Sequence, residues 1–242
     1  MKFSIITPSL NQGKYIEDTI ISVLNQDYKD FEHLVIDGGS NDETVSILKK
    51  YNHLSWVSEK DRGQAHAINK GFEKANGDII AWINSDDYYE KNVFGGIAAY
   101  FEANPDCMVL YGDITFVDKT KKNLGLIEGD VINHQNLIRN PDIVRQPSTF
   151  WRKEILCEFK GVDENYHLVM DFDFFLRIST THKFHYYHKN LSYYRYYNEN
   201  KSLSMAKRQL REIYNVYKKN NISFTYPVCK YLSLKYLHSR GL

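Results

Sequence analysis

Short apolar runs alternate with amphipathic segments over the first 85 residues of this 242-residue chain. Runs that are typical of strands span residues 3–6 (before Pro8), 34–36, 54–57 and 79–83. Helical spacing of apolar residues fills the intervals, over 15–25, from Ser40 and Glu43 to Lys50, and over 65–75. Parallel strands need long crossover connections, and a strand–helix alternation supplies them. The pattern therefore predicts an α/β fold with a doubly wound, mostly parallel sheet.

The alternation loosens after about residue 112. Strands are predicted around 112–117 and 191–194, and helices at 90–102 and 170–180. We expect one domain over 1–205, divided into halves 1–112 and 113–205. Residues 206–242 carry eight Lys or Arg residues against one acid, Glu212, and are rich in Tyr. This stretch is predicted to be a basic helical tail.

Each early strand is followed by a polar loop that is rich in turn residues. These loops span residues 7–13, 37–40, 59–64 and 84–87. The carboxyl ends of parallel strands share one edge of a sheet, where ligands bind, so the loops predict a nucleotide cleft. Asp37 could accept a hydrogen bond from a base or a ribose hydroxyl. The absence of a GxGxxG fingerprint and of a P-loop lysine argues against a dinucleotide dehydrogenase or an ATPase.

Two adjacent carboxylates, Asp86 and Asp87, directly follow the apolar run 79–83. Neighbouring carboxylates repel one another unless a positive group lies between them. A divalent cation that carries a diphosphate would supply that charge. The alternative is a helix N-terminus, where Asp is favoured as a cap. The pair alone favours the cap, whereas the four loops together favour the metal site.

Composition restricts the setting. A net charge of +1 gives no indication of a nucleic-acid partner, and none is expected. The three cysteines lack metal-type spacing, which favours a reducing compartment. We find neither a signal-peptide core at the N-terminus nor an apolar run near the ~20 residues that span a bilayer. A cytoplasmic location is therefore expected.

Four strings then establish a resemblance. TPSLNQGKYIEDTIISVLNQ, VIDGGSNDET, DRGQAHAINKGFEKANGDIIAWINSDD and GVDENYHLVMDFDFFLRI occur in the order and spacing of family 2 glycosyltransferases. The chain resembles this family over about residues 3–205. The resemblance implies the GT-A fold, with a nucleotide-sugar half followed by an acceptor half. It also implies an inverting transfer from a nucleotide sugar, most often a UDP-sugar, assisted by Mn²⁺ or Mg²⁺.

The resemblance also implies site residues. Donor binding is expected at Thr7, Pro8, Ser9, Asn11, Asp37, Gly39, Asp61, Arg62, Asn84, Ser85 and Asp86. Asp86 and Asp87 match the metal-binding motif, with Asp87 expected as the direct ligand. Asp171 matches the general base. The acceptor is expected to contact Gln146, Trp151 and Asp173.

An inverting sugar transfer requires carboxylates at two separate positions of the site. Inversion needs a hydroxyl to attack opposite the leaving diphosphate while a carboxylate accepts its proton. The metal neutralises the departing phosphate. Asp171 could serve as the base, with Asp173 next in line; the alternative for both is a solvated helix start. Trp151 could stack on an acceptor sugar or be buried.

The chain departs from the family at several positions. Met170 replaces a common Glu, Asn84 a common Asp, and Tyr197 a His that some relatives carry near a metal or phosphate. Arg195 is a possible phosphate partner instead. The QxxRW pattern of processive synthases is absent, which favours the addition of single sugars.

Two other classes of function stay open: a sugar-nucleotide-binding module without catalysis, and a nucleotidyltransferase. The resemblance suggests a glycan or lipid-linked glycan as acceptor. The basic tail could attach the protein to anionic lipid on the inner face of the membrane. Alternatively, the tail packs on the catalytic domain or forms a dimer contact.

Overall fold

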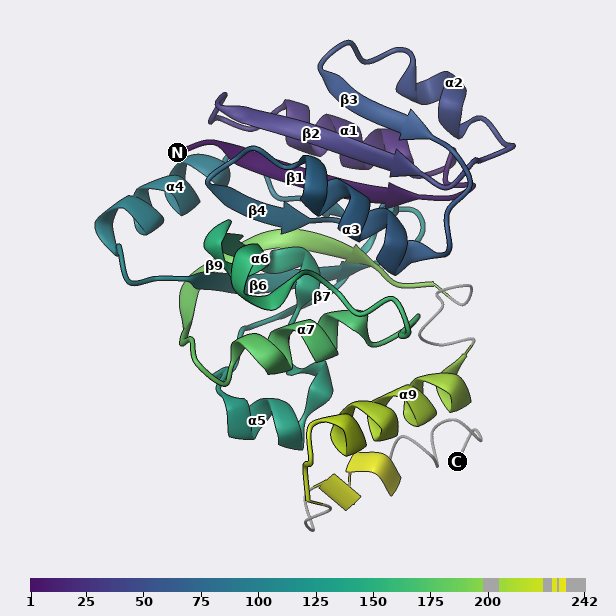
Figure 1. Ribbon diagram of the computed structural model, residues 1–242. Coiled ribbons are helices and arrows are strands. Elements are labelled where there is room, and N and C mark those ends of the chain that lie inside the picture. The colour runs from purple at the N-terminus through teal and green to yellow at the C-terminus, as the bar shows by residue number, and fades with distance from the viewer. Residues whose placement is uncertain (198–204, 224–227, 230, 234–242) are drawn as a thin grey trace.

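The computed structural model describes residues 1–197, 205–223, 228–229 and 231–233. Within them the chain forms one nine-stranded sheet flanked by helices (Figure 1). The strands are β1 (Phe3–Ser9), β2 (Phe31–Asp37), β3 (Leu54–Ser58), β4 (Ile79–Trp82), β5 (Tyr88–Tyr89), β6 (Val109–Val117), β7 (Asn123–Ile127), β8 (Thr149–Arg152) and β9 (Phe184–Arg195). The helices are α1 (Ile16–Leu24), α2 (Thr44–Leu48), α3 (Gln64–Lys74), α4 (Phe94–Ala103), α5 (His134–Arg139), α6 (Glu154–Phe159), α7 (Met170–Ile178) and α9 (Ala206–Lys219), with 3₁₀ turns at Pro141–Ile143 and Gln146–Ser148.

The first half of the sheet is parallel, as the sequence predicts. Strands β3, β2, β1 and β4 lie side by side in that order, and each adjacent pair is parallel. The expectation that β1 ends before Pro8 is wrong, because the strand continues to Ser9 beside β2. The pairing of β1 with β4 ends at Ile6, so one side of β1 is open at Pro8. Proline is tolerated at such an open strand side.

The second half of the sheet is mixed. Strand β8 is antiparallel to both β4 and β6, while β6 and β9 are parallel to each other. Because β8 runs antiparallel to both of its neighbours, β6 and β9 run in the same direction as β4 and β1. The carboxyl ends of strands from both halves therefore meet at one edge of the sheet. The prediction of a mostly parallel sheet is confirmed for the first half, and this second half adds antiparallel pairs.

Helices cover both faces of the sheet, and Figure 1 shows α3 and α7 in front of it. Apolar residues from α3, α7 and the central strands form one buried cluster. Residues from α1, α4 and the opposite strand face form a second cluster. The first cluster contains a group of buried rings, in which Trp82 and Trp151 meet with centroids 5.5 Å apart. This packing fixes the position of α7 relative to β4.

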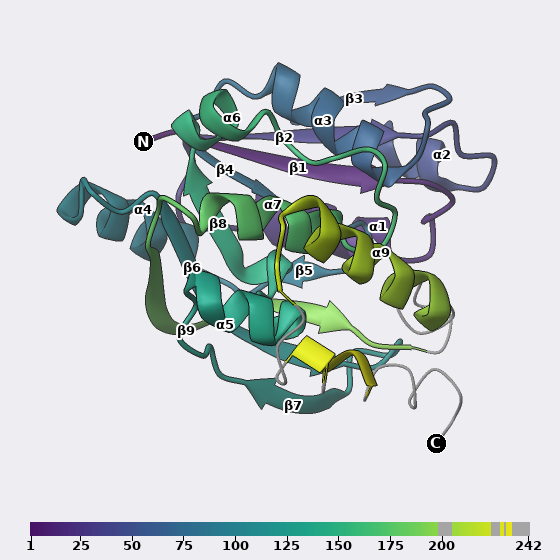
Figure 2. The same ribbon diagram turned by 60° about the horizontal axis from the view of Figure 1, so that its bottom comes forward.

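Helix α9 packs against the domain, and Figures 1 and 2 both show it beside α7. Its residues Ile213, Val216 and Tyr217 are buried. The Tyr217 hydroxyl donates a hydrogen bond of 2.7 Å to the carbonyl of Ile138. The predicted helix after residue 205 is thus present, and it belongs to the packed structure. Much of the remaining predicted tail lies outside the described residues.

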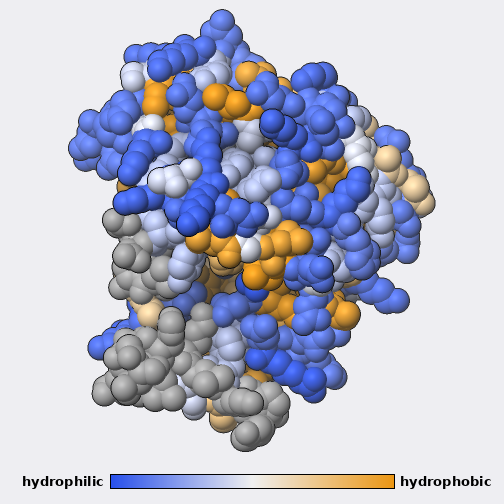
Figure 3. Space-filling view, turned by 180° about the vertical axis from the view of Figure 1, so that it is seen from behind, coloured by the Kyte–Doolittle hydropathy of each residue, from blue (hydrophilic) through white to orange (hydrophobic). Residues whose placement is uncertain are grey.

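The side of the molecule seen in Figure 3 is largely hydrophilic, with hydrophobic groups gathered toward its middle. In the described ranges, no helix combines the length and the apolar character that crossing a bilayer requires.

Candidate active site

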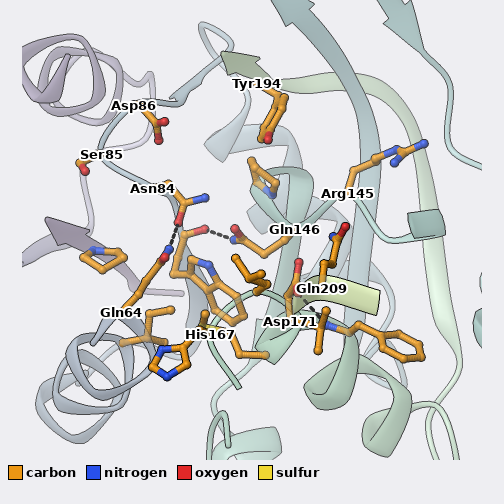
Figure 4. Close-up of a pocket in the computed structure, with 18 of the residues that line it drawn as sticks. Gln64, Asn84, Ser85, Asp86, Arg145, Gln146, His167, Asp171, Tyr194 and Gln209 are labelled. Atoms are coloured by element: carbon orange, nitrogen blue, oxygen red, sulfur yellow. Dashed lines mark hydrogen bonds between the residues drawn. The ribbon is translucent and has the colours of Figure 1, made fainter. Parts of the chain in front are cut away.

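A cavity of about 900 Å³ opens at the shared carboxyl edge of the strands. One end is lined by the loops after β1 and β4, and by the loop that leads into α3. The other end is lined by residues 141–147, by the segment that enters α7, and by one face of α9. Figure 4 shows side chains from these segments converging on the same space. The edge that the sequence predicts as a cleft is therefore a cavity in the structure.

The loop after β1 contributes Pro8 and Ser9 to the cavity wall. The Ser9 hydroxyl is buried and has no hydrogen-bond partner among the described residues. A buried unpaired hydroxyl is costly, so this atom is suited to a ligand contact. The predicted donor contact of Thr7 is not supported. Thr7 is fully buried, and its Oγ1 lies 2.9 Å from Nε2 of His33. Its side chain supports the sheet instead of lining the cavity.

Asp37 acts inside its own loop. The fully buried carboxylate accepts hydrogen bonds from the Ser40 backbone at 2.9 Å and from the Ser58 hydroxyl at 2.6 Å. Gly39 follows with a φ of +85°, a value that favours glycine. Neither residue lines the cavity, nor does the exposed Asn11. These three predicted donor contacts instead shape the loops behind the site.

Asp61 and Arg62 are adjacent but differ in placement. Asp61 lines the cavity, and its carboxylate accepts a hydrogen bond of 2.8 Å from the backbone of Gly63. The Arg62 side chain is 71% exposed and pairs with Glu164 at 2.8 Å. It does not line the cavity, so the predicted donor contact of Arg62 is not supported by this geometry.

Asn84, Ser85 and Asp86 all line the cavity, as predicted. The Asn84 side chain bridges two groups. Its Oδ1 accepts a hydrogen bond of 2.8 Å from Gln64, and its Nδ2 donates one of 3.3 Å to Asp87. The sequence reasoning missed Gln64, although the residue stands in a string that carries the resemblance. Its position as the first residue of α3, directly after a cleft loop, was the available signal.

Asp86 and Asp87, the two acidic residues after β4, were both expected to bind the metal, but they differ in exposure. Asp86 lines the cavity, whereas Asp87 is only 1% exposed. The Asp87 carboxylate accepts a 2.9 Å hydrogen bond from the backbone of Arg195. Burial, together with the neighbouring Asp86 charge, raises the pKa of Asp87 well above its usual range. Asp86 is thus the member of the pair that lines the cavity, and the expectation that Asp87 is the more direct metal ligand stays a prediction. The helix-cap alternative is wrong, because β5 follows the pair.

Arg195 and Tyr197 at the end of β9 hold this acidic pair in place. Arg195 is buried, and its guanidinium donates to the backbone carbonyl of Asp86 at 2.8 Å and to Asp18 at 2.9 Å. The expectation of a phosphate contact for Arg195 is therefore wrong. The Tyr197 hydroxyl donates a 2.7 Å hydrogen bond to Oδ2 of Asp86. A phenol thus contacts the acidic pair where some relatives are expected to carry a histidine.

Asp86 and Asp87 could bind a divalent cation only together with further ligands. Among the residues that the structure describes, no three His, Cys, Asp or Glu side chains gather to form a complete metal site. Burial and the neighbouring Asp86 charge both disfavour a second ionised carboxylate here, an effect that a bound cation would oppose. Mg²⁺ and Mn²⁺ commonly combine one or two carboxylates with substrate phosphates and water. The residues therefore fit a cation that arrives with a diphosphate.

Asp171 belongs to the first turn of α7 and lines the end of the cavity that lies opposite Asp86. One carboxylate oxygen accepts a 2.9 Å hydrogen bond from the backbone of Phe172. Burial raises the pKa of Asp171 to about 6. A carboxyl group with such a pKa is ionised near neutrality and is a better proton acceptor than an ordinary aspartate.

The three predicted acceptor contacts separate in the structure. Gln146 lines the cavity and donates a 2.5 Å hydrogen bond to the carbonyl of Trp82. Trp151 is fully buried among aromatic rings, so the predicted acceptor stacking is wrong. Asp173 is also fully buried, and it pairs with Arg177 at 2.9 Å and Lys219 at 3.3 Å. An acceptor role for Asp173 is therefore wrong.

Comparison with known proteins agrees with this geometry. Residues 4–158 match the model of the family described as glycosyl transferase family 2. The putative teichuronic acid biosynthesis glycosyltransferase TuaG of Bacillus subtilis is 40% identical over 95 residues, which are 37% of this chain and 37% of TuaG. A PGL/p-HBAD biosynthesis glycosyltransferase of Mycobacterium tuberculosis is 26% identical over 72% of this chain and 68% of its own length.

Solved structures give the same picture for the fold. Residues 1–349 of Staphylococcus aureus TarS in complex with UDP-GlcNAc superpose with a TM-score of 0.70 at 23% identity, over 89% of this chain and 66% of that one. A Pyrobaculum calidifontis mannosyltransferase in complex with GDP-Man and Mn²⁺ gives a TM-score of 0.67 at 18% identity, over 98% of this chain and 70% of that one. The match covers 39% of a longer TarS chain. These likenesses confirm the predicted GT-A fold.

Proposed function

Because the chain belongs to glycosyl transferase family 2, we propose that it transfers one sugar from a nucleotide sugar to a hydroxyl of a glycan or lipid-linked glycan, with inversion. One observation carries the proposal: Asp86 and Asp171 lie at opposite ends of one cavity, at the carboxyl edge of the sheet. An inverting transfer needs one carboxylate near the leaving diphosphate, to hold the metal, and another near the attacking hydroxyl, to act as the base.

The end of the cavity near Asp86 would hold the donor. Ser9 offers an unpaired buried hydroxyl, and Asp61, Asn84 and Ser85 add polar groups around it. A UDP-sugar is favoured because the TarS structures contain UDP and UDP-GlcNAc. TarS itself is named a poly(ribitol-phosphate) β-N-acetylglucosaminyltransferase, which supports a polyol-containing polymer as the class of acceptor.

Asp86, with Asp87 behind it, would hold Mn²⁺ or Mg²⁺ together with the donor diphosphate. The Mn²⁺ in the complex of the similar mannosyltransferase supports this assignment. When bound, the cation would offset the negative charge that develops on the leaving nucleoside diphosphate. Arg195 and Tyr197 keep the Asp86 backbone and carboxylate in position through the two hydrogen bonds described above.

Asp171 would accept the proton of the attacking hydroxyl. Its Oδ1 is held by the Phe172 backbone, which orients the carboxylate at the start of α7. A pKa of about 6 leaves the group ionised at pH 7, so that it can take a proton as the new glycosidic bond forms.

A donor screen tests the proposal. The full-length protein is incubated with UDP-GlcNAc, UDP-glucose and GDP-mannose, each with Mn²⁺ or with chelator, and products are identified by mass spectrometry. Slow release of UDP or GDP with the free sugar is expected even without an acceptor. Asp171→Asn is the matched control, since it keeps the shape of the site.

The same screen separates the alternative classes. A nucleotidyltransferase would produce pyrophosphate, and a binding module would yield no product from any donor. Either result with folded protein would overturn the proposal. A retained anomeric configuration in the transfer product would overturn inversion alone.

The exposed basic face of α9 gives a location to test. Lys207, Arg211 and Lys218 are exposed on that helix. A cluster of basic residues favours an anionic bilayer surface. We therefore include peripheral attachment to the cytoplasmic face of the membrane in the proposal, where a lipid-linked acceptor would be presented.

A further inference from the structure

The cavity has a wall that the family strings do not include. Ala206, Gln209 and Ile213 of α9 line the cavity, and their spacing of three and four residues places them on one helix face. Figure 4 shows Gln209 beside Asp171, with both side chains extending into the same space. The helix that the sequence predicts as a tail therefore contributes to the end of the cavity that holds the proposed base.

The Gln209 side chain is free to contact a ligand. It is partly buried, and its amide makes no hydrogen bond with the residues that the structure describes; only its backbone is bonded, to Met205. Because this amide lines the cavity without a partner in the part of the protein that the structure describes, a ligand can bond to it without first breaking another contact there.

The amide and the carboxylate offer complementary chemistry to the same ligand. Asp171 uses one oxygen for the Phe172 backbone, and the structure gives its second oxygen no partner within the described ranges. Ionised carboxylates only accept hydrogen bonds, whereas an amide both donates and accepts. A sugar or polyol with two neighbouring hydroxyls fits this arrangement, with one hydroxyl at Asp171 and the next at Gln209.

A second contact fixes α9 relative to Asp171. The Glu212 carboxylate is buried and accepts hydrogen bonds from the backbones of His167 at 2.9 Å and Leu168 at 2.8 Å. Its other oxygen pairs with Arg208 at 2.9 Å. Residues 167 and 168 lead directly into α7, where Asp171 lies in the first turn. One carboxylate thus ties the segment that carries the base to the helix that carries Gln209.

We propose that α9 forms a wall of the acceptor subsite, in which Gln209 contacts the hydroxyl next to the reacting one. Glu212 is a positioning residue that keeps Gln209 opposite Asp171. The acceptor is accordingly a vicinal diol, as in a sugar ring or a polyol chain. This inference rests on the proposed function, because it assigns the acceptor end of the same cavity.

The placement of Gln209 is tested without any substrate. The Asp171 carboxyl is titrated by ¹³C NMR in the full-length protein, with its signal assigned through Asp171→Asn. A new carboxylate in Gln209→Glu should raise the Asp171 midpoint by about half a unit or more, because like charges nearby disfavour ionisation. Asn215→Glu makes the same change at an exposed position of α9 and should leave the midpoint unchanged. Equal midpoints in the two variants would overturn the proposal.

The contact is tested by kinetics with UDP-GlcNAc as donor and glycerol as a small vicinal diol that competes with water. Gln209→Ala should lower the ratio of transfer to glycerol over hydrolysis by water about tenfold, the cost of one hydrogen bond, because water has no neighbouring hydroxyl. Asn215→Ala should leave this ratio unchanged. An unchanged ratio in Gln209→Ala would contradict the assignment. If the wild-type protein transfers sugar neither to glycerol nor to water, the proposed function fails, whereas the NMR titration still decides where Gln209 points.

The positioning role has its own readout. Glu212→Gln keeps the side-chain shape and removes the charge, so amide hydrogen exchange at His167 and Leu168 should accelerate about tenfold, as expected for a weakened charge-assisted hydrogen bond. The ratio of transfer to glycerol over hydrolysis by water should fall, as it should in Gln209→Ala. Arg208→Gln leaves both backbone contacts in place and serves as the control. Unchanged exchange in Glu212→Gln would reduce Glu212 to an ordinary buried acid.

Discussion

Asp171 and Asp173 lie two residues apart in the first turn of α7, yet they face different surroundings. Asp171 lines the cavity, with one backbone hydrogen bond on its carboxylate. Asp173 is fully buried and is paired with Arg177 and Lys219. Two residues correspond to about 200° around a helix, which accounts for the opposite directions. Neutralising Asp171 and neutralising Asp173 should therefore affect different properties of the protein.

Neutralising Asp171 should remove catalysis and spare the fold. Asp171→Asn cannot take up a proton as a carboxylate does, so we expect transfer or donor hydrolysis to fall by about 10²–10⁴-fold. UDP affinity, measured by calorimetry, should stay within twofold because the base lies at the far end of the cavity from Asp86. Wild-type turnover in a folded variant would place the base elsewhere.

Neutralising Asp173 should instead lower stability. Asp173→Asn weakens a charge-assisted contact to Arg177 and Lys219, and we expect a loss of about 1.5–3 kcal/mol in the free energy of unfolding. Denaturant titration measures this loss. The kcat for donor hydrolysis, measured well below the unfolding midpoint, should stay within a few-fold of wild type. A stable but inactive Asp173→Asn protein would contradict the structural role.

The rate of donor hydrolysis should depend on the ionisation of Asp171. Its pKa is raised to about 6, so the carboxylate is almost fully ionised at pH 7.5 and mostly protonated at pH 5. A base must be ionised to accept a proton, and kcat/KM should therefore fall about tenfold per unit as pH drops below 6. A pH–rate profile that is flat between pH 5 and 7.5 would exclude Asp171 as the titrating base.

Donor affinity should depend on the metal through the acidic pair. UDP should bind more tightly with Mn²⁺ or Mg²⁺ than with chelator, as measured by calorimetry. Asp86→Asn should abolish the difference because Asp86 lines the cavity. Asp87→Ala should abolish it too, and should also lower stability because the buried carboxylate anchors the Arg195 backbone. Equal UDP affinity of wild type with and without metal would contradict this prediction.

The buried His33 should make the protein sensitive to acid. Burial lowers the pKa of His33 to about 3, so it stays neutral in the folded protein while the unfolded chain takes up a proton below pH 6.5. The contribution is present above pH 6.5 and is lost as pH falls, by about 2 kcal/mol at pH 5. His33→Asn should flatten the pH dependence of unfolding, whereas the exposed His188→Asn should not. Parallel curves for both variants would contradict the prediction.

The basic face of α9 should bind anionic lipid if the protein is peripheral. Truncation after Met205 is a poor test because α9 packs on the domain. The triple variant Lys207→Glu, Arg211→Glu, Lys218→Glu changes exposed residues only. Each cation contributes about 1 kcal/mol near such a surface, so co-sedimentation with phosphatidylserine vesicles should be lost in the variant and in high salt. Wild type that stays in the supernatant at low salt would end the membrane proposal.

Much of the fold and part of the site follow from local sequence. The period of the apolar residues predicts strands β1–β4 and the helices between them, because that period reports which side chains face the core. The polar loops at strand ends predict the cavity edge, and Asn84, Ser85 and Asp86 line it as expected. Asp171 was found through a motif, and the structure places it in the same cavity.

Other features depended on contacts between distant parts of the chain. Asp86 faces the cavity and Asp87 does not, because Asp87 is bonded to the backbone of Arg195, 108 residues away. Trp151 was a candidate sugar contact until the packing of α7 and β4 enclosed it. The role of α9 depends on Glu212 reaching His167 and Leu168.

The sequence by itself thus determined the order of strands and helices, the edge at which ligands bind and the acidic residues available there. The tertiary structure decided which of those residues face the cavity and that α9 closes its far end. Periodicity and motifs record the local environment of each residue. The direction of a side chain at a strand end or a helix start depends on partners that only folding brings into contact.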